Sequence, residues 1–271
     1  MTNPFPFLYD LEPECPPGLL ARARALPKPR VALVNAGSAP ALRGIRETME
    51  AGLADPILVG DPRRIAQTAE EIDWDIKGIP LIKAPRDNAA PAAVGLVRDG
   101  QADALMKGQI HTSTFLKSLL PSANGLRAPG TRCGHVMHIT MPGQDRPLLL
   151  TDAALNVAPD IATRKACLTH AVRLAQKLGI ARPKAGLLAA SEDPTPSVPH
   201  TLEDLEITEW AKTALQEAIV QGPMAMDLIL SRESAEIKEY ASEVSGDADI
   251  IVVPDITTGN AVFKLMSLGM G

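Results

Sequence analysis

The sequence has few aromatic residues, no excess of positive charge and no long apolar segment. Phe, Trp and Tyr make up only 3% of the chain, so Ala, Leu, Val and Ile must fill the core, which is typical of parallel strands covered by helices. The formal net charge of −5 argues against nucleic acid as a partner, because binding to a phosphate backbone needs a basic face. An anionic small molecule stays compatible with this charge, since a few cations dominate a single cleft. No apolar run approaches the roughly 18 residues of a membrane-spanning helix.

Cysteine is scarce, and common cofactor motifs are missing. Cys15, Cys133 and Cys167 lie far apart without a CxxC pair, which argues against a disulfide framework and a thiolate zinc site and predicts reduced thiols in a cytoplasmic protein. The N-terminal segment contains prolines and acids and does not resemble a signal peptide. Neither GxGxxG nor GxxxxGK[ST] occurs. No metal is expected, because His135 and His138 are three residues apart in an expected strand and would face opposite sides.

The sequence does contain a regular alternation of short apolar runs and amphipathic segments. In its first half this alternation predicts an α/β fold with a doubly wound, mostly parallel sheet and right-handed crossovers. The expected strands are residues 30–37, 55–62, 78–85 and 102–108. The expected helices are residues 16–26, 39–53, 63–72, 87–99 and 112–120.

The pattern changes after residue 120. Two apolar runs, 134–142 and 147–155, are separated by a short turn and predict a β-hairpin. We expect the boundary between two α/β lobes there, with the first lobe at 1–142 and the second at 143–271. The other elements expected in the second lobe are strands at 184–191 and 248–255 and helices at 160–178, 202–220 and 257–268.

Four of the expected strands run into polar segments. These are NAGSAP at 35–40, MKGQIHTS at 106–113, LTDAALN at 150–156 and PDITTGN at 254–260. In doubly wound sheets, ligands bind beyond the carboxyl ends of the strands, and N–H groups at a helix start bind phosphate oxygens. Glycine at 108 and 259 would let a ligand approach the backbone closely. A lysine, a glycine and hydroxyl residues in one of these segments suit an anionic ligand.

Each of these polar residues also has a purely structural interpretation. Lys107 is equally compatible with a solvated side chain at a strand end, and Asp255 with a cap of the last helix. His111 fits a polar surface or capping residue better than a base. Asp152 and Asn156 suit turn positions as well as ligand positions.

Taken together, these segments resemble the phosphate acetyl/butyryltransferase family, in particular phosphate butyryltransferases and the acyltransferase part of enoyl-CoA hydratase/phosphate acetyltransferase proteins. The resemblance covers about residues 30–271 and rests on the order of ADALMKG, GLRAPGTRCGHV, TDAALNVAPD, LLAASEDPTPSVPHT, GPMAMD and ADIIVVPDITTGN. It implies two α/β/α lobes with a cleft between them, related in fold to isocitrate and isopropylmalate dehydrogenases. It also implies a homodimer or a larger homo-oligomer.

The resemblance implies an enzyme that interconverts a short-chain acyl-CoA plus phosphate with an acyl phosphate plus CoA. CoA and phosphate would be substrates, and no cofactor or metal would be bound permanently. The chemistry needs a thiol that loses its proton, donors for an oxyanion, and both substrates held together in a ternary complex. The acyl length stays open between acetyl, propionyl and butyryl. The residues expected to contact or organise the substrates are Lys107, Gly108, His111, Thr112, Ser113, Asp152, Asn156, Asp255, Thr258, Gly259 and Asn260.

One departure from the family pattern leaves the catalytic residues unassigned. In the family a Ser-Arg pair and an acid follow one more strand beyond the PDI-x-x-GN helix, whereas this sequence stops at Gly271 and Ser231-Arg232 comes too early to match. We therefore expect a truncated sequence, with little or no acyl transfer if these residues are the whole chain. Two alternatives stay open: a metal- and NAD-dependent β-decarboxylating dehydrogenase of related fold, and a catalytically incomplete binder of CoA or acyl phosphate.

Overall fold

The computed structural model describes residues 14–141 and 143–269. Their contacts form two compact units: Leu20–Thr131, and the described part of Arg132–Gly271 together with residues 14–19. The predicted boundary at 142/143 lies inside the β-hairpin of the second unit, whereas the contacts divide the chain at 131/132. The reason is that both strands of the hairpin belong to one sheet, so a boundary between them would separate two strands that are hydrogen-bonded to each other.

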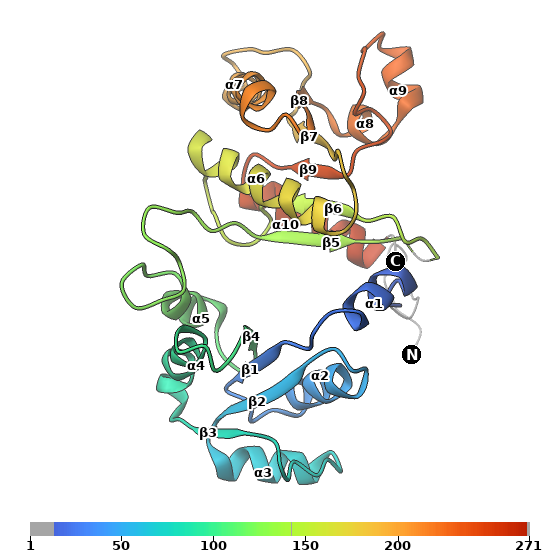
Figure 1. The fold of residues 1–271 in the computed structure, drawn as a ribbon. Helices are drawn as coiled ribbons and strands as arrows, with labels where there is room; N and C mark the ends of the chain where they lie inside the picture. Colours follow the sequence, from blue (N-terminus) through green and yellow to red (C-terminus); the bar gives the residue numbers. More distant parts are fainter. Residues whose placement is uncertain (1–13, 142, 270–271) are drawn as a thin grey trace. The chain divides into compact units, whose positions relative to one another are not determined.

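The first unit is built on a four-stranded parallel sheet with the order β3–β2–β1–β4 (Figure 1). Its strands are β1 (Arg30–Val34), β2 (Asp55–Gly60), β3 (Leu81–Lys83) and β4 (Ala104–Lys107). The helices up to the end of this unit are α1 (Pro17–Arg24), α2 (Ala39–Glu50), α3 (Pro62–Glu71), the 3-10 turn η1 (Arg86–Asn88), α4 (Ala89–Arg98) and α5 (Thr112–Leu119).

Apolar side chains bury both faces of this first sheet. One core cluster packs Val34 and its neighbours against Ala93 of α4. The other packs Leu33 against Leu42 of α2 and Ile65 of α3. Leu33 and Val34 enter different clusters because successive side chains of a strand point to opposite faces. Burial on both faces explains why these strands are continuous apolar runs in the sequence.

The second unit is built on a five-stranded sheet with the order β5–β6–β9–β7–β8. The β5–β6 pair is the predicted antiparallel hairpin, and the other pairs are parallel, so the predicted α/β class with mostly parallel sheets is confirmed. The strands are β5 (Val136–Ile139), β6 (Leu148–Thr151), β7 (Lys184–Leu188), β8 (Ile219–Met224) and β9 (Ile250–Val252). The helices are α6 (Ile161–Lys177), α7 (Pro199–Ala214), α8 (Met226–Leu230), α9 (Arg232–Ile237) and α10 (Ile256–Gly269).

One predicted helix is wrong in its second part. The sequence pattern predicts a helix over 202–220, but α7 ends at Ala214 and the chain then forms β8 at the edge of the sheet. This strand includes Gly222 and Pro223, which obscure the period of a strand in the sequence. Proline is tolerated in an edge strand, where an N–H group is not needed on the open side. Pairing with β7 therefore overrides the local helical pattern.

Cys15, Cys133 and Cys167 are all free, and Cys167 is buried. Over residues 14–141 and 143–269, no helix has the length and apolar character needed to cross a membrane. The same residues contain no group of three or more His, Cys, Asp or Glu side chains arranged to hold a metal ion.

Candidate functional site

In the first unit, the polar ends of β1 and β4 meet because these strands are neighbours in the sheet. The N–H of Gly108 donates to the carbonyl of Val34 at 2.9 Å, and the N–H of Gln109 donates to the carbonyl of Asn35 at 3.2 Å. Asn35 has the left-handed φ of 57°, and its amide donates back to the carbonyl of Gln109. The two turns are therefore fixed against each other at the carboxyl edge of the sheet.

Glycine is required at position 108 by this close approach. A Cβ at Gly108 would collide with the carbonyl oxygen of Val34 and lie 2.7 Å from that of Asn35. Both are backbone atoms, which cannot move aside as the end of a flexible side chain can. The packing of two turns therefore explains Gly108 without a ligand, although it also leaves the edge free of side-chain bulk.

Arg64 of α3 lies at the same edge, and the sequence reasoning missed it. Its Nε donates to the carbonyl of Gly37 at 2.8 Å, and its Nη2 donates to Oε1 of Gln109 at 2.9 Å. These two bonds fix a positive charge where β1 and β4 end. The available signal was the pair of arginines in the first turn of α3, the helix that follows β2, because the carboxyl ends of parallel strands lie at one edge of the sheet.

The remaining predicted residues of the first unit are exposed. Lys107 ends β4 and extends into solvent, as its structural interpretation predicts. His111 is the N-cap residue of α5, but no side chain caps this helix. Thr112 and Ser113 occupy the exposed first turn. The start of α5 thus presents exposed hydroxyl groups, which suit an anion.

In the second unit, TDAALN and PDITTGN come together because β6 and β9 are paired neighbours. Beyond the strands, the N–H of Val253 donates to the carbonyl of Thr151 at 2.8 Å. Gly259 packs directly on this loop, since a Cβ there would lie 2.8 Å from the Cα of Ala153 and 3.0 Å from the carbonyl oxygen of Asp152. Glycine at 259 therefore lets the first turn of α10 rest on the TDAALN backbone.

Asp152 is a buried carboxylate that holds its own loop. Only 4% of the residue is exposed. Its Oδ1 accepts from the N–H groups of Ala154 at 3.0 Å and Leu155 at 2.9 Å. Its Oδ2 accepts from the N–H of His135 at 3.2 Å and from Nδ2 of Asn156 at 2.6 Å. This geometry supports an organising role for Asp152 in place of direct contact with a ligand.

Asn156 and Cys167 complete the surroundings of Asp152. Nδ2 of Asn156 also donates to the carbonyl of Cys133 at 3.0 Å, which ties the TDAALN loop to the segment before β5. The Sγ of Cys167 lies 3.9 Å from Oδ2 of Asp152. Burial, followed by the negative charge of Asp152, raises the pKa of the Cys167 thiol to about 12. Cys167 is therefore an unreactive core thiol at neutral pH.

Asp255 is the residue before α10 and accepts hydrogen bonds from its first turn. Its Oδ1 accepts from the N–H of Thr258 at 2.9 Å, and its Oδ2 accepts from the hydroxyl of Thr258 at 3.0 Å. Burial alone would raise the pKa of Asp255, but the bonds from Thr258 and from the N–H of Thr257 outweigh it and lower this pKa. Asn260 is exposed in the same turn. The predicted capping interpretation of Asp255 is thus confirmed.

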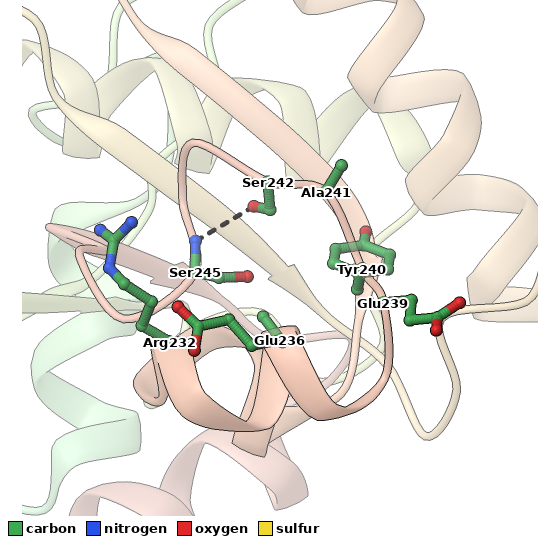
Figure 2. Close-up of a pocket in the computed structure, with 8 residues that line it drawn as sticks. Arg232, Glu236, Glu239, Tyr240, Ala241, Ser242 and Ser245 are labelled. Carbon is green, nitrogen blue, oxygen red and sulfur yellow. Dashed lines mark hydrogen bonds between the residues drawn. The ribbon is translucent and has the colours of Figure 1, made fainter.

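The structure gathers the predicted residues into two groups, one at the carboxyl edge of each sheet. Two hollows in the second unit lie away from both groups. One, of about 280 Å³, is shown in Figure 2 and is lined by residues such as Arg232, Tyr240 and Ser245. The buried Oγ of Ser245 has no hydrogen-bond partner among the described residues. The other, of about 320 Å³, is lined by residues such as Leu148 and Met266. No predicted site residue lines either hollow.

Comparison with known protein families and sequences gives a consistent result. A model of the family described as "Phosphate acetyl/butaryl transferase" matches residues 83–268. The chain is 34% identical over 251 residues to the phosphate butyryltransferase of Clostridium acetobutylicum, covering 92% of this chain and 83% of that protein. It is also 34% identical over 248 residues to a phosphate acetyltransferase of Rhizobium meliloti, covering 91% of this chain and 78% of that protein.

Solved structures give the same result for the fold. The branched-chain phosphotransacylase from Enterococcus faecalis V583 superposes with a TM-score of 0.73 and 31% identity, covering 88% of this chain and 83% of that one. A 4-hydroxythreonine-4-phosphate dehydrogenase from Burkholderia phymatum superposes with a TM-score of 0.51 and 12% identity, covering 90% and 85%. The second likeness bears out the expected dehydrogenase-related fold and carries no information about activity.

Proposed function

The chain belongs to the phosphate acetyl/butyryl transferase family, and from this premise we propose that it interconverts a short-chain acyl-CoA plus phosphate with an acyl phosphate plus CoA. Phosphate acyl transfer is the activity of the family. The observation that carries the proposal is the 34% identity to a phosphate butyryltransferase and to a phosphate acetyltransferase, each over more than nine tenths of the chain. The substrates CoA, phosphate and acyl phosphate follow from this activity.

The reaction proceeds by direct attack of the CoA thiol on the acyl phosphate in a ternary complex. The sulfur forms a bond to the carbonyl carbon as the thiol loses its proton, and a tetrahedral oxyanion develops. The bond from this carbon to the phosphate oxygen then breaks, and phosphate leaves with the electron pair. Holding both substrates in one complex lowers the barrier by removing the entropy cost of their encounter.

The first unit supplies the groups that bind anions. Lys107 and the first turn of α5, with Thr112 and Ser113, contact phosphate oxygens, and His111 at the start of this helix lies beside them. Gly108 keeps the turn free of side-chain bulk. The support is the exposure of these groups at the carboxyl edge, beside a further fixed cation at Arg64.

The second unit supplies a rigid loop at the carboxyl edge of its own sheet. Asp152 and Asn156 hold the TDAALN loop in shape, as their shared hydrogen bonds require. The first turn of α10, with Asp255, Gly259 and Asn260, contacts the substrates, and Thr258 fixes Asp255 by two hydrogen bonds. The enzyme works in the cytoplasm as a homodimer or a larger homo-oligomer. The three free thiols support the cytoplasmic part of this proposal.

The test is phosphate-dependent release of free CoA from acetyl-CoA, propionyl-CoA and butyryl-CoA, followed with a thiol-reactive dye. Release that requires phosphate would support the proposal, and the rates would rank the acyl lengths, which single methylenes separate by about 1–3 kcal/mol. CoA binding by calorimetry without release would favour the incomplete binder. Reduction of NAD with a hydroxyacid and a divalent metal would instead favour the dehydrogenase alternative.

A further inference from the structure

An arginine joins the two turns that follow β1 and β4 in the first unit. Nε of Arg64 donates to the carbonyl of Gly37, in the turn after β1, at 2.8 Å. Its Nη2 donates to Oε1 of Gln109, in the turn after β4, at 2.9 Å. The guanidinium is therefore held by acceptors on two neighbouring strand ends, at the carboxyl edge of the sheet.

These two strand ends form the topological switch point of the sheet. In the order β3–β2–β1–β4, the chain runs outward from β1 to β2 and β3 and then returns to the other side of β1 to form β4. The helix after β1, α2, packs on one face of the sheet through Leu42, and the helix after β4, α5, packs on the other face through Phe115. Ligands of doubly wound sheets bind at such a point, and Arg64 bridges it.

The sequence makes room for this arginine at position 37. A Cβ at Gly37 would lie 2.8 Å from Cγ and from Cδ of Arg64. Gly37 does not have the positive φ that would by itself call for glycine. The methylene groups in the middle of the arginine cannot move aside without disturbing the two bonds of its guanidinium. Glycine at 37 is therefore explained by the side chain of Arg64 that lies on it.

The positive charge of Arg64 is not neutralised by a carboxylate among the described residues, whereas Arg30 in the same unit pairs with Asp103 at 2.8 Å. A guanidinium has N–H donors on every nitrogen, and the two bonds of Arg64 use only one on Nε and one on Nη2. The donors of Nη1 and the second donor of Nη2 have no partner in the described part of the chain. Neutral acceptors thus orient a cation whose remaining donors suit two oxygens of one phosphate group.

We propose that Arg64 binds a phosphate group of the substrates through the free donors of Nη1 and Nη2, and that Gly37 and Gln109 position it. The inference rests on the proposed function. Its substrates offer the same oxygen atoms from more than one source: the inorganic or acyl phosphate, and the diphosphate and 3′-phosphate of CoA. Gln109 belongs to the MKGQIHTS segment, which also contains Lys107, so this edge combines a fixed cation with an exposed, movable one.

The test measures the Kd of four ligands by calorimetry: inorganic phosphate, CoA, dephospho-CoA, which lacks the 3′-phosphate, and pantetheine, which has no phosphate. Arg64→Gln should raise the Kd of at least one phosphate-bearing ligand about 10–100-fold, because the phosphate loses a charged partner. The Kd of pantetheine should not change. A rise for inorganic phosphate alone assigns Arg64 to the reacting phosphate. A rise for CoA but not dephospho-CoA assigns it to the 3′-phosphate, and a rise for both assigns it to the diphosphate.

The matched control is Arg63→Gln, because Arg63 is the neighbouring arginine of α3 and its side chain forms no hydrogen bond or ion pair with the described residues. This variant should bind all four ligands as the wild type does. Arg64→Lys keeps the charge but cannot bond both Gly37 and Gln109 as the planar guanidinium does, so it should weaken the same ligand by a smaller factor. Gly37→Ala should weaken that ligand too, because it displaces the arginine.

Failure of the inference and failure of the proposed function are distinguishable. If the wild type releases CoA in the presence of phosphate, but Arg64→Gln leaves every Kd unchanged or weakens pantetheine as much as CoA, the inference is overturned and the proposed function stands. Should Arg64→Gln fail to fold, Arg64→Lys decides, and unchanged Kd values in it would overturn the inference. If the wild type binds neither CoA nor phosphate and releases no CoA, the proposed function fails, and the inference fails with it.

Discussion

The buried carboxylate of Asp152 gives the sharpest test of how the TDAALN loop is held. The substitution Asp152→Asn keeps the size of the side chain but replaces one carboxylate oxygen by an NH2 group. Each oxygen of Asp152 accepts at least two hydrogen bonds, from Ala154 and Leu155 on one side and from His135 and Asn156 on the other. Either orientation of the amide therefore leaves at least two donors facing an NH2 group.

The expected cost follows from these lost bonds. A hydrogen bond to a charged group is worth about 1.5–3 kcal/mol, so two of them correspond to about 3–6 kcal/mol. Water cannot replace them, because only 4% of Asp152 is exposed. Allowing for some relaxation, we expect a loss of about 3 kcal/mol, which lowers the melting temperature of a domain of this size by about 6–12 °C.

The assay is thermal unfolding of the second unit, followed by tryptophan fluorescence. The chain has two tryptophans, and a Trp74→Phe background leaves Trp210 of α7 as the reporter. The matched control is Asp160→Asn, because Asp160 caps α6 at an exposed position where Asn caps as well as Asp. If Asp152→Asn melts within about 1 °C of this control, the carboxylate does not hold the loop and the reasoning is refuted.

Three further predictions concern other parts of the chain. Gly259→Ala should lower the melting temperature by several degrees, because the new Cβ would lie 2.8 Å from the Cα of Ala153 in the TDAALN loop. The control Gly95→Ala should be neutral or stabilising, because a Cβ there would meet none of the described atoms within 4 Å. Lys107→Gln should raise the KM for phosphate or CoA about tenfold at an unchanged melting temperature; an unchanged KM would argue against anion binding there. The hydrogen bond from Lys184 lowers the pKa of Asp247, so Asp247 should stabilise the folded state above about pH 4 and lose this contribution as pH falls. In Asp247→Asn, the free energy of unfolding, measured by urea titration at each pH, should therefore fall less steeply with acid than in the wild type.

The sequence predicted the fold best where burial and local signals agree. The strands β1 and β4 lie inside the predicted apolar runs. Asp160, the first residue of the predicted helix 160–178, is the N-cap residue of α6, and its Oδ1 accepts from the N–H of Thr163 at 2.7 Å. The strand β8 was not predictable from its pattern, because Gly222 and Pro223 interrupt the period and its pairing depends on β7, far back in the chain. Long-range pairing decides such segments, and one sequence does not contain it.

The residues of the candidate site also differ in whether the sequence could predict them. The reasoning from strand ends identified TDAALN and PDITTGN, which lie together because β6 and β9 are paired. It missed Arg64, because this residue projects from a helix whose packing against the sheet decides where it points. Residues on strand-end turns are therefore predictable from the sequence, whereas residues on the following helices need the structure.

The two edges of the second sheet differ in what their charged groups do. At the amino edge, Arg146 bonds Asp247 at 2.7 Å and Asp249 at 3.0 Å, and Lys184 bonds Asp247 at 2.6 Å. These residues precede or begin β6, β7 and β9, and they satisfy one another across three strand ends. At the carboxyl edge, the buried carboxylate of Asp152 is also satisfied, but Asn260 in the first turn of α10 is exposed. Substitutions at the amino edge should therefore change stability alone, whereas only the carboxyl edge can separate a loss of turnover from a loss of folding.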